Sequence, residues 1–281
     1  MRSIASTDGV TLAVHDFGGV GRTVFLSHAT GFHGRVWTTV AARLSDRFHC
    51  VAVDYRGHGD SNRPADGDYV WTGFADDTCA VMDDLAAATA LAGRPFGLGH
   101  SKGGASLLMA ELRRPGTFAA LVLFEPVVLP PEIRRDDPIP IAAAARRRRS
   151  EFDSFDAALA NFSSKPPLNS FEPETLREYV YHGLRTTGTG TVRLKCNPED
   201  EARTFEGARQ DIWEHLEAVR CPVLILAGRE AAVGPGSVAQ AVAERLPNGE
   251  IQTWPFLSHF GPQEAPGLIA ETAASFFAAH H

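Results

Sequence analysis

The segment Gly99-His100-Ser101-Lys102-Gly103 places a serine between two glycines in the pattern G-x-S-x-G. The apolar run 95–98 before it predicts a buried strand, and residues 104–112 after it have a helical pattern. A serine at so sharp a strand-to-helix turn stands out from the sheet edge, and glycines are needed because the turn leaves no room for side chains. The helix start then directs backbone N–H groups at whatever the serine attacks. The segment predicts a nucleophilic Ser101; the alternative is a glycine-rich turn with an incidental serine.

The composition is that of a globular protein with one large core: 281 residues, 44% hydrophobic and 22% charged. The net charge of −7 is spread along the chain, which argues against nucleic acid or an anionic membrane as a partner. The basic run 146–149 has acidic neighbours, and we interpret it as a solvated helix face rather than an anion or substrate site.

The four cysteines lack paired spacing, which disfavours a disulfide framework or a zinc site and fits a reducing compartment. We expect no metal and no cofactor. The first residues lack an apolar segment of signal-peptide length, and no stretch is long and apolar enough to cross a bilayer. These features predict a cytoplasmic protein. We also expect a monomer or a homodimer that acts on a small molecule.

Apolar runs alternate with helical patterns along most of the chain, which predicts a parallel sheet flanked by helices. The predicted strands cover residues 10–15, 23–27, 49–54, 95–98, 119–124, 222–228 and 250–254, and the predicted helices cover 74–91, 104–112, 236–246 and 263–279. This alternation stops over residues 129–215, which are richer in proline and charge. We therefore expect residues 1–128 and 216–281 to form the core, with 129–215 inserted as a helical cap.

Four landmarks stand in a characteristic order: Ser27–Phe32, Asp54–Ser61, Gly99–Gly103 and Ser258–Pro262. Through them the chain resembles the α/β-hydrolase superfamily over nearly its whole length. The resemblance implies an α/β fold with a mostly parallel central sheet, flanking helices and an inserted cap.

His259 is the best candidate for the base that activates Ser101, because it follows the last predicted strand and imidazole exchanges protons near neutral pH. The alternative is a structural histidine. By the same resemblance, His28 and His100 correspond to structural histidines around the site. We expect His58 to hold its loop in place rather than to take part in chemistry.

The third member of the triad departs from the common pattern. Many relatives carry an aspartate three residues past the glycine that corresponds to Gly228, but here that residue is Ala231. Glu125, at the end of the strand after the elbow helix, and Glu230 are both available. We favour Glu125 because strand ends are held more rigidly than loops. A Ser–His dyad assisted by water, with Glu125 in a structural role, stays open.

The oxyanion hole is expected to combine the backbone N–H groups of Lys102 and Thr30. The Lys102 side chain is unusual, since relatives often have methionine there. We expect its stem to pack and its ammonium to reach solvent or an acid such as Glu125; a contact with a substrate carboxylate is the alternative.

Aromatic side chains around the serine predict a largely apolar pocket between core and cap. The candidates are Phe32, Trp37 and Phe124 of the core and Phe155, Phe162 and Tyr181 of the cap.

The leading hypothesis is a serine hydrolase that cleaves a carboxylic ester, lactone or thioester through an acyl-enzyme. The same triad also serves C–C bond hydrolysis or acyl transfer. A non-catalytic ligand receptor on this scaffold is the third possibility, because the usual aspartate is missing.

Overall fold

A computed structural model describes residues 1–88, 93–133, 140–208, 211–230 and 233–280. Its main sheet has eight strands in the order β1-β2-β4-β3-β5-β6-β10-β11. Strand β2 pairs in antiparallel fashion with β1 and with β4, and every other pair in this sheet is parallel. The predicted mostly parallel sheet is therefore confirmed. The strands are β1 (Arg2–Ala5), β2 (Thr11–Gly18), β3 (Thr23–Ser27), β4 (His49–Asp54), β5 (Phe96–His100), β6 (Leu121–Phe124), β10 (Val223–Ala227) and β11 (Gly249–Thr253).

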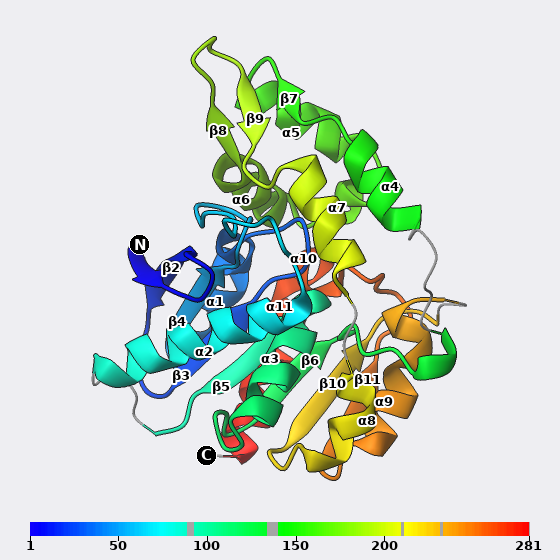
Figure 1. Cartoon of the computed structure of the whole chain (residues 1–281). Helices are drawn as coiled ribbons and strands as arrows, with labels where there is room; N and C mark the ends of the chain where they lie inside the picture. The colour runs from blue at the N-terminus through cyan, green and yellow to red at the C-terminus, as the bar shows by residue number, and fades with distance from the viewer. Residues whose placement is uncertain (89–92, 134–139, 209–210, 231–232, 281) are drawn as a thin grey trace.

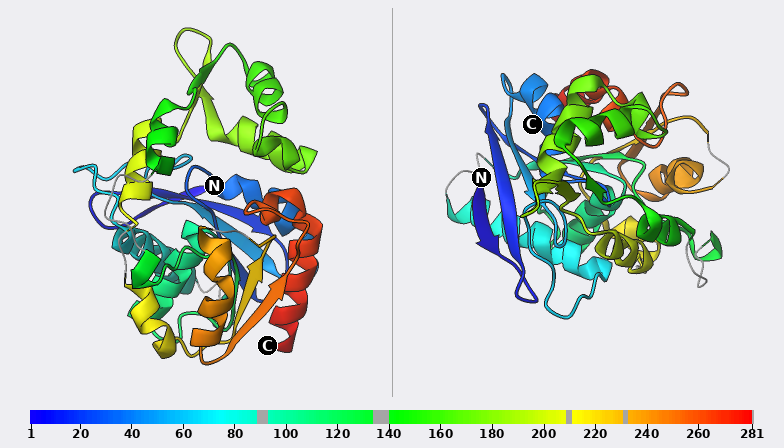
Figure 2. Two further views of the ribbon diagram at one scale, coloured as in Figure 1. Left: turned by 90° about the vertical axis from the view of Figure 1, so that its right-hand side faces the viewer. Right: turned by 90° about the horizontal axis from the view of Figure 1, so that it is seen from above.

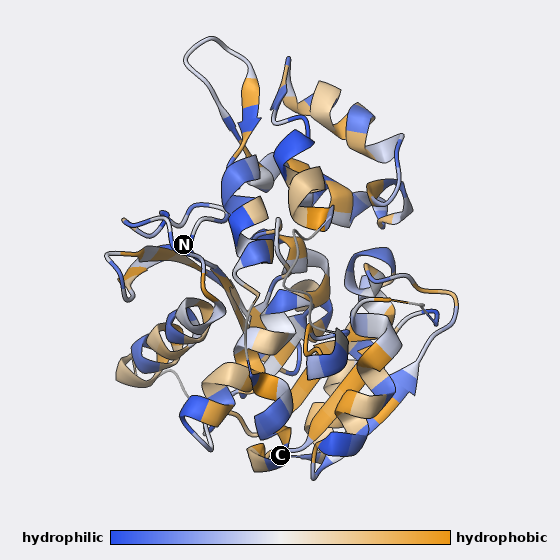
Figure 3. Cartoon of the chain, turned by 45° about the vertical axis from the view of Figure 1, so that its right-hand side comes forward, coloured by the Kyte–Doolittle hydropathy of each residue, from blue (hydrophilic) through white to orange (hydrophobic). Residues whose placement is uncertain are grey.

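Helices cover both faces of the sheet, as a parallel sheet requires (Figures 1 and 2). Along β3, Val24 and Leu26 point into the apolar cluster that contains α1 and α11, while Phe25 points into the cluster that contains α2, α3 and α9. Figure 3 shows hydrophobic strands in the sheet, and helices around it that carry both hydrophilic and hydrophobic residues. The core helices are α1 (Thr38–Leu44), α2 (Trp71–Ala87), α3 (Lys102–Arg113), α8 (Ile212–His215), α9 (Ala239–Arg245), α10 (Gly261–Glu264) and α11 (Pro266–Ala279).

The part of the chain from α4 to α7 lies beyond the main sheet, at the top of Figure 1. It contains α4 (Pro140–Arg147), α5 (Phe155–Ser163), α6 (Pro173–Gly183) and α7 (Pro198–Glu206). It also contains a small antiparallel sheet in the order β7-β9-β8, built from β7 (Glu151–Phe152), β8 (Leu184–Thr186) and β9 (Val192–Leu194). These strands could not be predicted from the sequence, because two or three residues are too few to show a two-residue period.

Single 3-10 turns complete the described structure: η1 (Gly34–Trp37), η2 (Pro131–Ile133), η3 (Leu168–Ser170), η4 (Leu216–Ala218) and η5 (Pro235–Val238). Among the helices of the described ranges, none combines the length and the apolar character needed to cross a membrane.

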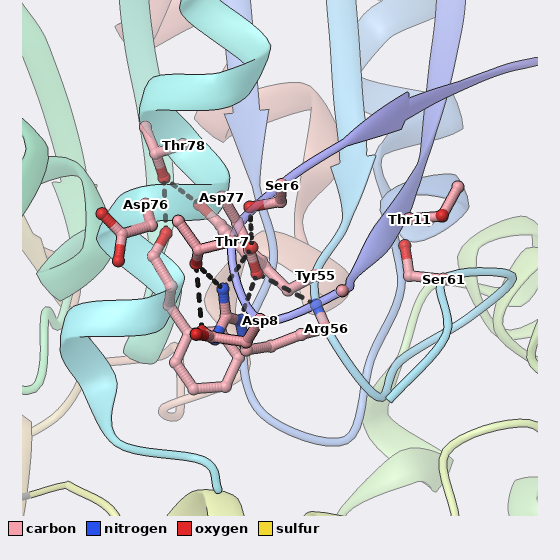
Figure 4. A network of polar contacts seen from close by, with 12 residues as sticks. Ser6, Thr7, Asp8, Thr11, Tyr55, Arg56, Ser61, Asp76, Asp77 and Thr78 are labelled. Carbon is pink, nitrogen blue, oxygen red and sulfur yellow. Dashed lines mark hydrogen bonds and ion pairs between the residues drawn. The ribbon is translucent and has the colours of Figure 1, made fainter. Parts of the chain in front are cut away.

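A buried ion pair fixes the loop that follows β4 (Figure 4). The Arg56 guanidinium donates to both carboxylate oxygens of Asp77 on α2, at 2.8 and 3.0 Å, and to Asp8 at 2.8 Å. His58 Nδ1 donates to the carbonyl of Arg56 at 2.9 Å. The loop is thereby attached to α2 and to the β1–β2 turn.

Candidate active site

Ser101 lies between β5 and α3 with φ 56° and ψ −121°, a strained conformation typical of a nucleophile elbow. The glycines around it are sterically required. A Cβ on Gly99 would lie 2.7 Å from the Cα of Gly104, and one on Gly103 would lie 2.2 Å from the carbonyl oxygen of Ser27. The chain can therefore make this turn only with glycine at these positions.

His259, in the loop between β11 and α10, reaches Ser101 from the far end of the chain. Its Nε2 lies 3.1 Å from Ser101 Oγ, within hydrogen-bonding distance. His100 is wholly buried and donates from Nε2 to the carbonyl oxygen of His259 at 2.7 Å. Burial lowers the pKa of His100 well below its usual value, so His100 is neutral and holds the His259 loop in place.

Glu125 is the first residue after β6, with φ 41°, and is 3% exposed. Its Oε2 accepts a hydrogen bond from His259 Nδ1 at 2.6 Å, and its Oε1 accepts one from the backbone N–H of Gly228 at 2.9 Å. A Cβ on Gly236 would lie 2.9 Å from Oε1, so that glycine leaves room for the carboxylate. The structure thus brings Ser101, His259 and Glu125 together in one hydrogen-bonded series.

Glu230 is exposed, and no hydrogen bond or ion pair joins it to His259. Ala231 lies outside the described residues. Of the two carboxylates that the sequence offered, only Glu125 is in contact with the imidazole.

Thr30 and Lys102 flank Ser101 from two different elements. Thr30, in the loop after β3, lines the same cavity as Ser101. Lys102 is the first residue of α3, so its backbone N–H has no acceptor within the helix. Gly31 continues the Thr30 loop with φ 80°, a conformation that favours glycine.

His28 supports this loop from below. Its Nδ1 donates to the carbonyl of Ala29 at 2.7 Å, and its Nε2 accepts from the backbone N–H of Tyr55 at 3.1 Å. Burial lowers the pKa of His28 well below its usual value, which matches a neutral histidine with one donor and one acceptor nitrogen.

The Lys102 side chain corrects our expectation. It is wholly buried, and its Nζ lies 3.7 Å from the ring centroid of Tyr55 and 4.3 Å from that of Phe74. It reaches neither solvent nor Glu125, and it does not line the cavity beside Ser101. The helix points this side chain back into the apolar layer against α2, where burial lowers its pKa well below the usual value.

A cavity of about 520 Å³ opens beside Ser101 and His259. Phe32 and Phe162 line it as expected, together with Phe260 and Leu168. The other predicted aromatic residues do not line it: Trp37 and Phe124 are fully buried in the core, and Phe155 and Tyr181 stack on each other with centroids 5.3 Å apart. The sequence does not show how deeply an aromatic side chain is buried, so all of these residues were equally good candidates for the cavity wall.

The cavity also contains polar residues that the sequence analysis did not single out. Arg148 Nη1 donates to Glu201 at 2.6 Å and Nη2 donates to the Tyr179 hydroxyl at 2.7 Å, and all three line the cavity. Arg149 lines it too, so the basic run is not simply a solvated helix face. Arg146 does fit the prediction of a solvated helix face, because it is exposed and forms ion pairs with Glu199 and Glu206. Arg148 and Glu201 are 53 positions apart, so a single sequence gives no sign that they pair.

The model of the Alpha/beta hydrolase family matches residues 24–272. The 2-(acetamidomethylene)succinate hydrolase of Mesorhizobium japonicum is 24% identical over 95% of this chain and 91% of its own. The pimeloyl-[acyl-carrier protein] methyl ester esterase of Chromobacterium violaceum is 28% identical over 86% of this chain and 88% of its own. The crystal structure of E-2-(acetamidomethylene)succinate hydrolase superposes with a TM-score of 0.81 at 23% identity, covering 99% of this chain and 98% of that one.

The family match covers most of the chain, and the superposition shows the same fold. The chain therefore belongs to the alpha/beta hydrolase family and is a hydrolytic enzyme.

Proposed function

We propose that the protein is a serine hydrolase that cleaves a carboxylic ester, lactone or thioester through an acyl-enzyme. The observation that carries this proposal is the series Ser101–His259–Glu125, with contacts of 3.1 and 2.6 Å, at the wall of a cavity. A serine hydroxyl is a weak nucleophile at neutral pH and needs such a base to become reactive.

In the first half-reaction, His259 Nε2 takes the proton of Ser101 as Oγ attacks the substrate carbonyl. Glu125 accepts the hydrogen bond from Nδ1, which fixes the tautomer and stabilises the imidazolium that forms. The negative charge on the carbonyl oxygen is met by the backbone N–H groups of Thr30 and Lys102. Collapse of the tetrahedral intermediate breaks the bond to the leaving group, which takes the proton from His259.

In the second half-reaction, His259 removes a proton from water, which attacks the acyl-enzyme. The acid product leaves, and the proton returns to Ser101 Oγ. The chain itself supplies the nucleophile, the base, the acid and the oxyanion donors of this cycle.

We assign substrate selection to residues 129–215, as a cap over the core of 1–128 and 216–281. Phe162, Tyr179 and Arg148 of this segment line the same cavity as Phe32 and Ser101. The apolar walls favour a small molecule with an apolar acyl or alcohol part.

A second candidate is hydrolysis of an acylated enamine or a related conjugated substrate. It is favoured by the likeness to 2-(acetamidomethylene)succinate hydrolase in both sequence and structure. The C–C hydrolase and acyltransferase alternatives use the same triad. Assays with a phenyl ester, an N-acyl enamine and a diketone side by side separate these reactions.

The direct test combines covalent labelling with kinetics. A fluorophosphonate probe should label the folded protein on one serine and should not label Ser101→Ala, and a short-chain p-nitrophenyl ester should be hydrolysed only by the parent protein. Folded protein that is neither labelled nor active would instead support the hypothesis of a non-catalytic ligand receptor.

A further inference from the structure

The cavity beside Ser101 has an apolar interior and a cationic mouth. Its inner wall consists of buried or half-buried residues, among them Phe32, Phe162 and Phe260. Its outer wall includes two exposed cations, Arg149 after α4 and Lys165 after α5. Both belong to the segment drawn in green at the top of Figure 1.

The charge at the mouth is not neutralised within the part of the chain that the structure describes. Arg149 Nε donates to the carbonyl of Glu151 at 2.8 Å and its guanidinium lies 4.5 Å from the Phe152 ring centroid. Lys165 Nζ donates to the amide oxygen of Asn161 at 2.9 Å. These contacts orient both cations, and the groups that make them, a backbone carbonyl, an aromatic ring and an amide oxygen, are uncharged. The carboxylate of Glu151 instead accepts a hydrogen bond from the Thr191 hydroxyl.

The third cation of the cavity is already paired. Arg148 forms its ion pair with Glu201, and among the described residues that line the cavity Glu201 is the one with a carboxylate. A Cβ on Gly31 would lie 2.5 Å from a Glu201 oxygen, so this pair packs directly on the loop that carries Thr30. The pair is thus occupied in joining the cap segment to that loop, and the excess positive charge stays with Arg149 and Lys165.

We infer that the substrate carries a carboxylate or a similar anionic group, which Arg149 and Lys165 bind while its apolar part fills the inner cavity beside Ser101. The chain as a whole carries a net charge of −7, so a cationic mouth contrasts with the rest of the molecule. Such a mouth concentrates anions locally and increases their association rate with the site. This inference rests on the proposed hydrolase function and narrows its substrate class.

The test compares isosteric charged and neutral substrates. Monomethyl adipate and its ω-amide place the difference on the acyl side, and 4-acetoxybenzoate and 4-acetoxybenzamide place it on the alcohol side. For at least one pair, kcat/KM of the anion should exceed that of the amide by about 3- to 10-fold, the effect of two rim ion pairs. In Arg149→Gln/Lys165→Gln the ratio should fall to about one, and raising the salt from about 50 to 500 mM should lower it in the parent protein.

The control variant is Arg185→Gln/Arg193→Gln, which removes the same charge. Arg185 and Arg193 face each other across β8 and β9 and line a different cavity, so this variant should keep the parental ratio. A parental ratio near one for both pairs, or a ratio that Arg149→Gln/Lys165→Gln leaves unchanged, would overturn the inference.

A binding measurement separates this inference from the proposed function. Ser101→Ala removes the nucleophile, and calorimetric titration with each anion and its amide then measures charge preference without turnover. The inference is supported if Ser101→Ala binds the anion more tightly than the amide and if Ser101→Ala/Arg149→Gln/Lys165→Gln does not. This result would support it even if no ester is hydrolysed. Hydrolysis of neutral esters with no preference for anions in binding refutes the inference and leaves the proposed function standing.

Discussion

The backbone N–H of Gly228 donates a hydrogen bond of 2.9 Å to the Oε1 atom of Glu125. Gly228 directly follows β10, the strand after which many relatives carry the triad acid, whereas Glu125 follows the adjacent parallel strand β6. The two strand ends lie side by side, so a longer carboxylate from β6 can contact His259 in place of an aspartate from the β10 loop. The chain thus retains a carboxylate in contact with His259, although alanine stands at position 231, where many relatives carry the aspartate.

The first prediction concerns this acid. Glu125→Gln should lower kcat for a short-chain aryl ester by about 10²- to 10⁴-fold, because the imidazole loses its tautomer control and its counter-charge. Glu230→Gln, an identical change on an exposed residue, should stay within about twofold of the parent. Steady-state kinetics on the two variants decide between the carboxylates. Loss of activity in Glu230→Gln alone would assign the acid to the β10 loop.

The second prediction concerns the space around the carboxylate. In Gly236→Ala the new methyl group would meet Glu125 Oε1 at 2.9 Å, and the carboxylate is already held by two hydrogen bonds. We expect kcat to fall by about tenfold through displacement of His259, with the protein still folded. Gly188→Ala is the matched control, because nothing lies within 4 Å of its added carbon. Equal kcat in the two variants would show that Glu125 tolerates the shift.

The third prediction concerns stability and pH. Lys102→Met removes a buried amine that has no hydrogen-bond partner among the described residues, and the methionine still fills the space with an apolar side chain. The substitution should therefore raise the free energy of unfolding at pH 7 by about 1–2 kcal/mol. The pKa of Lys102 in the folded protein lies well below its ordinary value of 10.5. At a pH between the folded-state pKa and 10.5, the amine is therefore protonated in the unfolded chain and neutral in the folded protein. Parent stability then rises with pH, and the advantage of the variant should shrink as the pH approaches 10.5.

Denaturant titrations of Lys102→Met and the parent at pH 7 and pH 9.5 measure this difference. A variant less stable than the parent at pH 7 would mean that the contacts with Tyr55 and Phe74 outweigh the burial of the amine.

The fourth prediction concerns the ion pair in Figure 4. Asp77→Asn should lower the free energy of unfolding by about 3–5 kcal/mol, because it leaves the buried Arg56 guanidinium without its main counter-charge. Asp83→Asn, on the same helix α2, breaks a surface pair with Arg114 and should cost no more than about 1 kcal/mol. Similar losses in both variants would show that Arg56 has found another partner.

Local sequence signals predicted the parts of the molecule that depend on local chemistry. The G-x-S-x-G turn, the parallel strands and most core helices follow from glycine sterics and from periodicity, and the structure has them within a few residues. Strand β1 and the short helix α1 were missed because four and seven residues carry too little pattern. The helix expected at 236–246 begins as the 3-10 turn η5.

The walls of the cavity could not be predicted in the same way. Trp37 and Phe32 are close in sequence and chemically alike, yet only Phe32 lines the cavity, because that depends on which face of the loop the fold turns inward. The Arg148–Glu201 pair joins the residue that follows α4 to α7, and no local pattern encodes how these two helices pack. The side chain of Lys102 was misplaced for the same reason, since a helix position adjacent to the site does not reveal which layer the side chain enters.

The proposed hydrolysis depends most directly on Ser101 acting as the nucleophile. Acid quenching of the enzyme within the first turnover of p-nitrophenyl acetate, followed by peptide mass spectrometry, should find an acetyl group on Ser101 and none in the Ser101→Ala variant. Turnover of the ester with Ser101 unmodified at every quench time, or with the acetyl group on another residue, would contradict it.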